Sequence, residues 1–569
     1  MDRLTQNIEN HFNLFASNKP WIDIKYNKRI IRRNQFRNNE SLSQGLLANR
    51  RCDVYVPGGV LRAAGFTVAD QTCKGDETIE LINMMSSMQE ESKNWILPLD
   101  SCCLSPSGSL NISISRRQTF EKVLKMVQDE GDRYGYKTLS MNQDVLLHCA
   151  VGPTNQESDM TLTQLRALLL RDHMEIMLKS VKLPVHNAGQ PNIPIWISEV
   201  FLISRHEKLP TVEHCTKKLQ TSLEESEFRV PTESMTEENR LQASNACNVL
   251  LNVSGYVEEQ RTIGKNYSKN IKTISVNETG TESVNLLEEL SMIEFVLDSL
   301  KKTVDIFVLH ITSHDREYKQ QCLDILQRIC SQHKCQHVHL VHGHVQVESS
   351  MPPGHMQISA HEFFKVRSKQ MRKASEMKHG ETIQGEMWDA RIARLTSAAL
   401  KFELLGTSPH NNIKLNLGEE AESRDGVFVM YNYARLSTLF NKLEQRVHAQ
   451  YYPPLPDIKD IDFSFLKEEA EWYILFQYIL PFPDIVAELL QPIFNSIGPR
   501  IQLQTHKICA FLMNLSKDLS TYYSRTHVLG EPRQHLLPVM FARLHLLKAV
   551  QRVMLNSLSL LNIQPLQQM

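Results

Sequence analysis

The sequence has no long apolar run of the kind that directs a chain to or across a membrane. Residues 1–15 lack the apolar core of a signal peptide, and no stretch approaches the ~18 uninterrupted apolar residues of a membrane span. The 11 cysteines are scattered and do not gather at the spacings of a disulfide framework. We therefore expect a cytoplasmic protein with free thiols and no membrane partner.

The motifs of several large enzyme classes are also missing. There is no G-x-S-x-G nucleophile elbow, no Walker loop and no G-x-G-x-x-G after a predicted strand. The net charge is −1, which excludes a strong overall field for nucleic acid, so any RNA contact has to come from local basic patches. The residues alone identify no catalytic site and no cofactor.

What the sequence does contain is ordinary globular material, with 41% hydrophobic and 22% charged residues. A basic run at 25–37 is interpreted as a solvated helix face or, alternatively, as a phosphate contact. An alternating strand at 110–115 and a helix at 118–132 indicate an N-terminal α+β module.

The middle of the chain changes pattern. A short apolar strand at 145–151 precedes an amphipathic helix at 160–180, and residues 193–197 are expected to form an edge strand because they contain a proline. Polar segments at 211–240 and 258–283 are interpreted as surface loops. Helices at 286–302 and 316–330 then alternate with strands at 306–311 and 337–341. This βαβ order predicts a parallel, Rossmann-like layer.

The last third is predicted to be all helical. A second basic stretch at 365–378 leads into it, and prolines separate the apolar-periodic segments. The predicted helices are 383–405, 427–448, 463–479, 482–497, 503–525 and 533–561.

One cluster has the residue types of a zinc site: Cys330, His333, Cys335, His337, His339, His342 and His344. Zinc needs about four converging ligands. However, His337 and His339 alternate with apolar residues in a predicted strand, which favours an exposed strand face, and no second Cys-x2-Cys pair is present. We expect no metal, and a stoichiometric zinc content would contradict this.

The C-terminal stretch resembles the DALR anticodon-binding domain of arginyl-tRNA synthetases over nearly its whole length. Leu400 to Leu404 resembles the family's A-x-K-[YF]-x-[DE]-L element, and Tyr431 to Arg435 resembles the Y-x-x-A-R helix that follows. Leu512 to Tyr523 is similar to a further helix of the domain, and Pro565 to Met569 is similar to its P-x-x-M terminus. Upstream, Gly108 to Ile112 resembles the end of the synthetases' N-terminal additional domain.

The catalytic signatures of that family are lost. Thr161 to Arg166 replaces the H-x-G-H-L-R signature, so both histidines and the glycine that serve ATP are absent. Ser350 to Gly354 stands where a K-M-S-K-like loop is expected, and its lysine is missing. The resemblance implies a degenerate class I synthetase-like Rossmann layer followed by a DALR helical bundle. We expect an N-terminal α+β domain at 1–144, a shortened Rossmann-like domain at 145–350 and an all-α domain at 351–569.

This combination is similar to the DALR anticodon-binding domain-containing proteins, which are synthetase-like but without synthetase activity. The resemblance implies a non-catalytic adaptor that recognises arginine tRNAs. The resemblance also implies a partner, a tRNA methyltransferase that forms 3-methylcytidine in the anticodon loop. The alternatives are a diverged arginyl-tRNA synthetase and a purely protein-binding scaffold.

Unstacked anticodon bases are held by aromatic rings and by hydrogen bonds at their edges. The resemblance therefore implies base contacts from Tyr431, Asn432, Tyr433, Arg435 and Met569, and phosphate contacts from Lys369, Arg372 and Lys373. The alternative for each aromatic residue is core packing, which is favoured for Trp472 and Tyr523 and is as probable as exposure for Tyr433.

Overall fold

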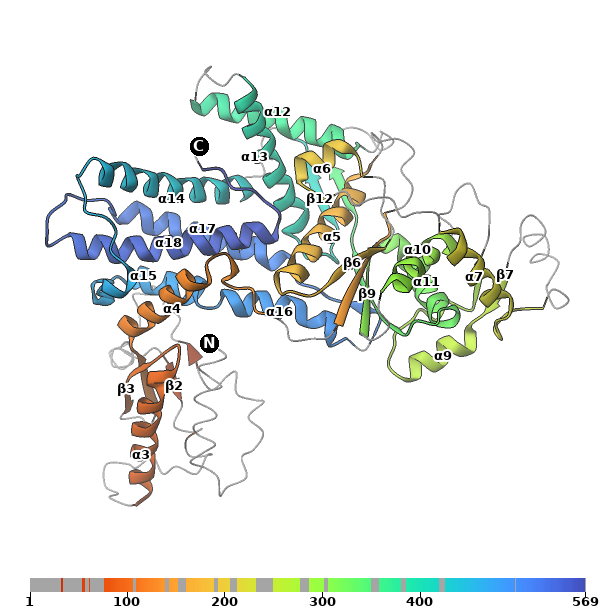
Figure 1. Ribbon diagram of the computed structural model, residues 1–569, viewed down its shortest axis with the longest axis horizontal. Coiled ribbons are helices and arrows are strands. Elements are labelled where there is room, and N and C mark those ends of the chain that lie inside the picture. Colours follow the sequence, from red (N-terminus) through yellow and green to blue (C-terminus); the bar gives the residue numbers. More distant parts are fainter. Residues whose placement is uncertain are drawn as a thin grey trace. The chain divides into compact units, whose positions relative to one another are not determined.

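The computed structural model describes residues 32–33, 54–56, 61, 76–105, 109–138, 143–151, 160–188, 193–204, 212–231, 249–276, 286–300, 305–348, 358–379, 385–418, 425–496 and 498–567 (Figure 1). They divide into two compact units, each assembled from separate parts of the chain. One unit comprises Met1–Gly131, Gln445–Pro481 and Arg525–Val550; the other comprises Asp132–Glu444, Phe482–Ser524 and Gln551–Met569. The expected boundaries at residues 144 and 350 divide the chain into three consecutive domains, whereas these two units interleave along the sequence. The three-domain division therefore stays a prediction.

The first unit contains an antiparallel sheet with strand order β1-β2-β4-β3. Its elements are β1 (Arg32–Arg33), β2 (Val54–Val56), α3 (Asp76–Glu91), β3 (Leu99–Leu104), β4 (Leu110–Ile114) and α4 (Arg116–Glu130). The predicted strand and helix are confirmed as β4 and α4. Arg32 and Arg33 lie in a strand, so a helix face is wrong for this pair; the rest of that basic run lies outside the described residues.

Helix α4 is anchored in the first unit by an aromatic contact. The Phe120 and Trp472 rings meet edge to face at 5.8 Å, and the Arg116 guanidinium lies 5.1 Å from the Trp472 ring centroid. Arg116 also pairs with Glu469 at 2.6 Å. Trp472 is 3% exposed, so its predicted core position is confirmed.

The second unit is built on a five-stranded parallel sheet with order β13-β10-β9-β5-β6. Its strands are β5 (Gln143–Cys149), β6 (Val185–Ala188), β9 (Asp305–Ser313), β10 (Cys335–His342) and β13 (Arg500–Ile501). The connecting helices include α5 (Leu162–Ser180), α10 (Leu286–Ser299) and α11 (Glu317–Cys330). The predicted βαβ unit is confirmed as β9-α11-β10.

Three segments around the sheet differ from the expected structure. Residues 193–197 form no strand; Pro194 is the N-cap of α6 (Ile195–Phe201), and its carbonyl accepts the first helical hydrogen bonds from Ile197 and Ser198. The expected loop at 211–240 contains α7 (Glu213–Glu224), because Cys215, Leu219 and Leu223 recur every four residues and are buried. Further on, α9 (Ser254–Thr262) and β8 (Thr273–Val276) occupy parts of the second expected loop; β8 pairs with β7 (Val249–Asn252).

The predicted C-terminal helices are present. They are α12 (Ala360–His379), α13 (Glu386–Leu405), α14 (Asp425–His448), α15 (Glu469–Ile474) with the π-helix Leu475–Ile479, α16 (Phe482–Phe494), α17 (His506–Arg525) and α18 (Leu537–Leu560). Between them lie β13, which joins the parallel sheet, and β12 (Ile413–Asn416), which pairs with β11 (Val345–Glu348). By length and composition, Glu469–Phe494 is apolar enough to cross a membrane, but 56% of its most apolar window is buried inside the structure.

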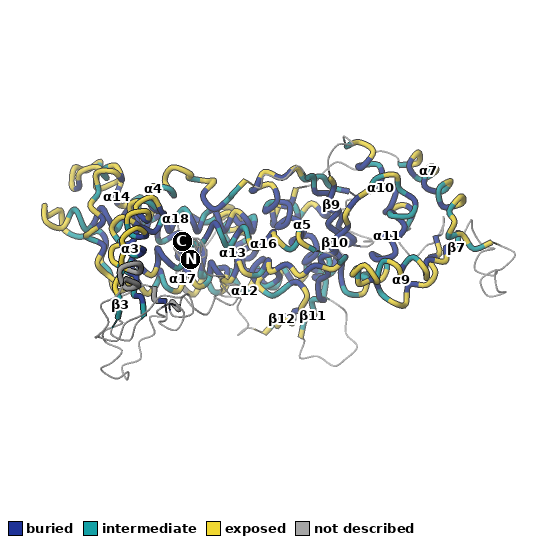
Figure 2. Tube along the Cα trace, turned by 90° about the horizontal axis from the view of Figure 1, so that it is seen from below, coloured by how far each residue is buried: buried dark blue, intermediate teal, exposed yellow. Residues whose placement is uncertain are grey.

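A row of histidines crosses the centre of the parallel sheet. His148, His310 and His339 are register partners on β5, β9 and β10, and they are at most 2% exposed. Strands β9 and β10 are coloured mostly as buried in Figure 2. His310 lies 3.1 Å from His148 between their Nδ1 atoms, and its Nε2 lies 2.8 Å from His337 Nδ1. Helix α11 supplies the polar partners, including Asp324, whose Oδ2 is 3.4 Å from His339 Nε2.

The expected exposed face for His337 and His339 is therefore wrong. Strand β10 lies inside the sheet between β9 and β13, and helix α11 covers its histidines. Among the described residues, His333 is the one member of the seven-residue Cys/His cluster that stands in a group with metal-ligand distances.

We predict that these histidines make the fold sensitive to acid. Burial lowers the pKa of His337 to about 3 and holds the pKa of His310 well below its usual value. Both stay neutral in the folded chain while the unfolded chain takes up protons below about pH 6.5. The free energy of unfolding should therefore fall by about 1.4 kcal/mol per pH unit for each such histidine as pH drops from 6.5 towards 4.

Urea unfolding at a series of pH values measures this slope. Replacing the exposed His535 with Ala should leave it unchanged. A stability that stays flat between pH 6.5 and 4 would contradict the prediction.

Candidate nucleic-acid interface

An arginine sandwiched between two tyrosines lies at the surface of helices α14 and α17. Tyr431 and Arg435 are four residues apart on α14 and so share one helix face. The Arg435 guanidinium carbon lies 5.8 Å from the Tyr431 ring centroid and 4.3 Å from the ring centroid of Tyr523 on α17. Tyr431 is 37% exposed. The cluster combines flat aromatic surface with a cation, which are the groups that bind an unstacked base.

Tyr523 also belongs to this cluster, although a core position was predicted for it from the sequence. It is only half-buried, and its neighbour Tyr522 is the one that packs inside at 2% exposed. Burial raises the pKa of the Tyr523 hydroxyl, while the nearby Arg435 charge acts in the opposite direction. Consecutive helical residues point about 100° apart, so the Tyr522-Tyr523 pair was the signal that one ring had to face outward.

Asn432 and Tyr433 lie on the opposite, buried side of α14. Asn432 is fully buried, and its side-chain amide donates to the Phe428 carbonyl at 2.9 Å. Tyr433 is 8% exposed. The predicted base contacts of these two residues do not fit their burial, because a base cannot stack on a ring covered by neighbouring helices. Met569 lies outside the described residues.

The basic stretch on α12 presents lysines outward and an arginine inward. Lys365, Lys369 and Lys373 are exposed and recur every four residues, so they form one row along the helix. Arg367 is 6% exposed and donates to Glu403 at 2.8 Å. Arg372 pairs with Asp389 of α13, which compensates its charge. Of the three predicted phosphate contacts, Lys369 and Lys373 are therefore exposed, whereas Arg372 is only partly exposed.

The residues at the start of α5, which stand where a synthetase signature is expected, hydrogen-bond to one another and to neighbouring backbone. Thr161 and Gln164 form a capping box: Thr161 Oγ1 accepts from the Gln164 amide at 3.2 Å, and Gln164 Oε1 accepts from the Thr161 amide at 2.8 Å. Gln164 also donates to the Val151 carbonyl, and Thr163 Oγ1 accepts from the Val345 amide, both at 3.0 Å. These neutral side chains bring no charge to a phosphate.

Arg166, the last residue of that replaced signature, is a buried structural cation. Its guanidinium donates to the carbonyls of Gly343, Asn411, Ser408 and Leu404 at 2.7–3.3 Å. Burial lowers its pKa to about 10. A Cβ at Gly343 would lie 2.5 Å from the Asn411 backbone, so glycine allows this close approach.

We predict that Arg166→Met destabilises the protein by at least about 3 kcal/mol, because it strips four buried carbonyls of a charged donor. Urea unfolding of the purified variant measures the loss. Lys369→Met, which removes an exposed cation, is the matched control and should change stability by less than about 0.5 kcal/mol. Equal stabilities of the two variants would show that the Arg166 contacts contribute little.

Comparison with solved structures assigns the fold. Arginyl-tRNA synthetase from Thermus thermophilus superimposes with a TM-score of 0.56 at 13% identity, covering 100% of both chains. The enzyme from Plasmodium falciparum gives 0.53 at 12% identity, covering 100% of this chain and 99% of the other. The chain thus has an arginyl-tRNA synthetase-like fold, with a parallel sheet flanked by helices and an all-helical C-terminal domain, which confirms the predicted fold class.

Sequence comparison assigns the family. The model of the DALR anticodon binding domain matches residues 429–569. Arginine–tRNA ligase from Borreliella burgdorferi is 28% identical over 29% of this chain and 25% of its own length. DALR anticodon-binding domain-containing protein 3 from Danio rerio is 31% identical over 86% of this chain and 88% of its own length; the Rattus norvegicus protein is 32% identical over 83% and 86%. The chain therefore belongs to the family of DALR anticodon-binding domain-containing protein 3.

Proposed function

We propose that this protein is a cytoplasmic, non-catalytic adaptor that binds arginine tRNAs through their anticodon region. It presents them to a tRNA methyltransferase that forms 3-methylcytidine in the anticodon loop. The observation that carries the proposal is the Tyr431–Arg435–Tyr523 cluster, which lies within the matched DALR anticodon binding domain. The chain keeps this recognition surface on a synthetase-like fold that lacks the signatures for ATP.

The cluster suits a single-stranded loop better than a duplex. A-form RNA helices display little base surface, whereas loop bases can turn outward and stack on aromatic rings. Arg435 holds both tyrosine rings through cation–π contacts, so their orientation is set before RNA arrives. Little side-chain entropy is then lost on binding.

The lysine row of α12 supports backbone contact. Lys369 and Lys373 are exposed one turn apart and carry charges that track phosphates without reading sequence. With a net charge of −1 for the whole chain, such a local row is the kind of patch that draws RNA to one face. Binding should therefore weaken steeply with salt.

The start of α5 supports an adaptor over a synthetase. Transition-state stabilisation requires charged or polar donors aimed at the developing charge. Here Thr161 and Gln164 hydrogen-bond to each other at the N-terminus of α5. The Arg166 guanidinium donates its hydrogen bonds to four backbone carbonyls. A protein that holds a tRNA without reacting on it needs a second protein to act on the loop, and a methyltransferase is the partner that the family resemblance implies.

We predict that Tyr431→Ala and Tyr523→Ala each weaken binding of an arginine tRNA by about 1–3 kcal/mol, or roughly 5- to 150-fold, because each removes a stacking ring. Tyr318→Ala is the control, since Tyr318 is 48% exposed but lies on α11 outside the DALR domain. Fluorescence anisotropy with labelled tRNA at fixed salt measures the affinities.

The lysine row provides an internal comparison in the same assay. The double variant Lys369→Ala, Lys373→Ala should weaken all tRNAs alike and lower the slope of log affinity against log salt by about one per lysine. Wild-type affinity in both tyrosine variants would show that tRNA does not bind at the Tyr431–Arg435–Tyr523 cluster.

We predict that the purified protein does not charge tRNA with arginine in the presence of ATP. When it is purified from cells, a methyltransferase and arginine tRNAs should accompany it, and its removal should reduce 3-methylcytidine in those tRNAs. Protein identification, sequencing of the bound RNA and nucleoside mass spectrometry measure these outcomes. Robust arginine- and ATP-dependent charging would instead establish a diverged synthetase.

A further inference from the structure

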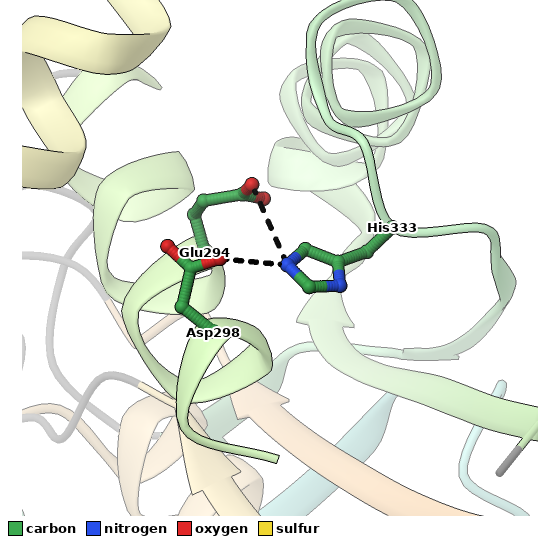
Figure 3. A group of neighbouring side chains, drawn as sticks. All are labelled: Glu294, Asp298 and His333. Atoms are coloured by element: carbon green, nitrogen blue, oxygen red, sulfur yellow. Dashed lines mark hydrogen bonds and ion pairs between the residues drawn. The ribbon is translucent and has the colours of Figure 1, made fainter. Parts of the chain in front are cut away.

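A cluster of metal-ligating side chains lies away from the tRNA-binding elements, where three segments of the second unit meet. Glu294 and Asp298 stand four residues apart on α10 and share one helix face. His333 comes from the turn between α11 and β10 and points its imidazole at both carboxylates (Figure 3). Helix α7 adds Cys215 and Lys218.

The distances fit one small cation. His333 Nε2 lies 2.8 Å from Asp298 Oδ1 and 3.9 Å from Glu294 Oε1, and the three ligand atoms all lie within 4.8 Å of one another. A tetrahedral zinc ion bound at about 2.0–2.1 Å keeps its nitrogen and oxygen ligands about 3.3 Å apart. The two distances from His333 lie on either side of this value, so side-chain rotation can bring the ligand atoms to the spacing of a bound ion.

A thiol stands next to these three groups. Cys215 is 4% exposed, and its Sγ lies 3.9 Å from Asp298 Oδ2. Burial, with the Asp298 and Glu294 charges, raises the pKa of this thiol. The thiol stays outside the group of mutually close ligand atoms that Glu294, Asp298 and His333 form, so it borders the site and is not counted among its ligands. Imidazole nitrogen and carboxylate oxygen are donors that zinc binds in proteins.

The position between the carboxylates already attracts a cation. The Lys218 ammonium lies 3.3 Å from Glu294 Oε1 and 3.3 Å from both oxygens of Asp298. Its side chain is 30% exposed, whereas Glu294 is fully buried. A flexible lysine at the rim can rotate into solvent, so Lys218 acts as an exchangeable counter-ion that a divalent ion displaces.

The ligands are held by a second set of contacts. Ser331 Oγ donates to Glu294 Oε2 at 2.7 Å, which leaves Oε1 facing His333. The same hydroxyl accepts from the His333 amide at 3.0 Å, and Gln327 donates to the His333 carbonyl at 3.3 Å. Such outer contacts orient the ligands of metal sites.

We propose that Glu294, Asp298 and His333 bind one divalent transition-metal ion, with Zn²⁺ as the best fit, in competition with Lys218, although the sequence alone led us to expect no metal. The ion ties α10 to the turn before β10 and so stabilises the middle of the chain. The proposal is independent of tRNA binding, because none of these residues belongs to the DALR domain or to α12.

The test uses the full-length protein after chelator treatment, titrated with Zn²⁺ by calorimetry and with Co²⁺ by absorption spectroscopy. One ion should bind per chain, raise the melting temperature with rising zinc concentration and, as Co²⁺, give visible absorption. His333→Ala should lower the affinity at least tenfold, because it removes one of the three ligands.

Lys218→Met distinguishes the metal site from an ion-pair network and is the variant that keeps the ligands intact. Removing the competing ammonium should tighten zinc binding at least tenfold, whereas a purely structural lysine would leave zinc affinity unchanged. His214→Ala, an exposed histidine on the same helix, is the control for adventitious binding and should have no effect. Absence of uptake in both wild type and Lys218→Met, or uptake that is lost in His214→Ala, would overturn the proposal.

Discussion

The second unit depends on one buried ammonium group that serves three backbone carbonyls. Lys401 on α13 is 1% exposed and donates to the carbonyls of Phe201, Leu561 and Asn562 at 2.7–3.1 Å. Phe201 is the last residue of α6, and Leu561 and Asn562 directly follow α18. Backbone carbonyls at a helix C-terminus have no partner within the helix and need another donor. Burial lowers the pKa of Lys401 to about 8, and the nearby Asp172 charge opposes that shift. One side chain thus holds together α13, the end of α6 and the segment after α18.

Arg166 acts in the same way at the C-terminal end of α13, where the Leu404 carbonyl is one of its acceptors. Both cations replace water at carbonyls that would otherwise be buried without donors, which is costly in a dry interior. Both belong to segments that resemble synthetase motifs: Lys401 to the run Ala399 to Leu404 and Arg166 to the run Thr161 to Arg166. In each segment a buried cation joins backbone carbonyls from distant parts of the chain.

The packing of buried faces determines which side chains helices α14 and α12 present to solvent. Helix α14 buries Asn432 and Tyr433 in the bundle, and this packing holds Tyr431 and Arg435 at the surface beside Tyr523. On α12, the inward bond of Arg367 to Glu403 fixes the helix so that its lysines face out. In both helices the contacts of the buried face determine which side chains form the exposed face.

Local patterns in the sequence were enough for much of the fold. The βαβ order, the helices between prolines and the core position of Trp472 follow from residue periodicity and from backbone limits that act within a few residues. The DALR motifs were likewise readable in the chain and pointed to Tyr431 and Arg435. The family and the fold therefore rest on information that each segment carries by itself.

Tertiary structure decided which face of each segment is covered. Periodicity does not reveal that α11 covers a row of histidines on β10, or that β13 joins a sheet formed far upstream. Nor does it show that Tyr523 faces outward beside Arg435, or that His333 meets two carboxylates of α10. Burial, charge pairing and ligand geometry arise between segments distant in sequence, and only the folded chain brings those segments together.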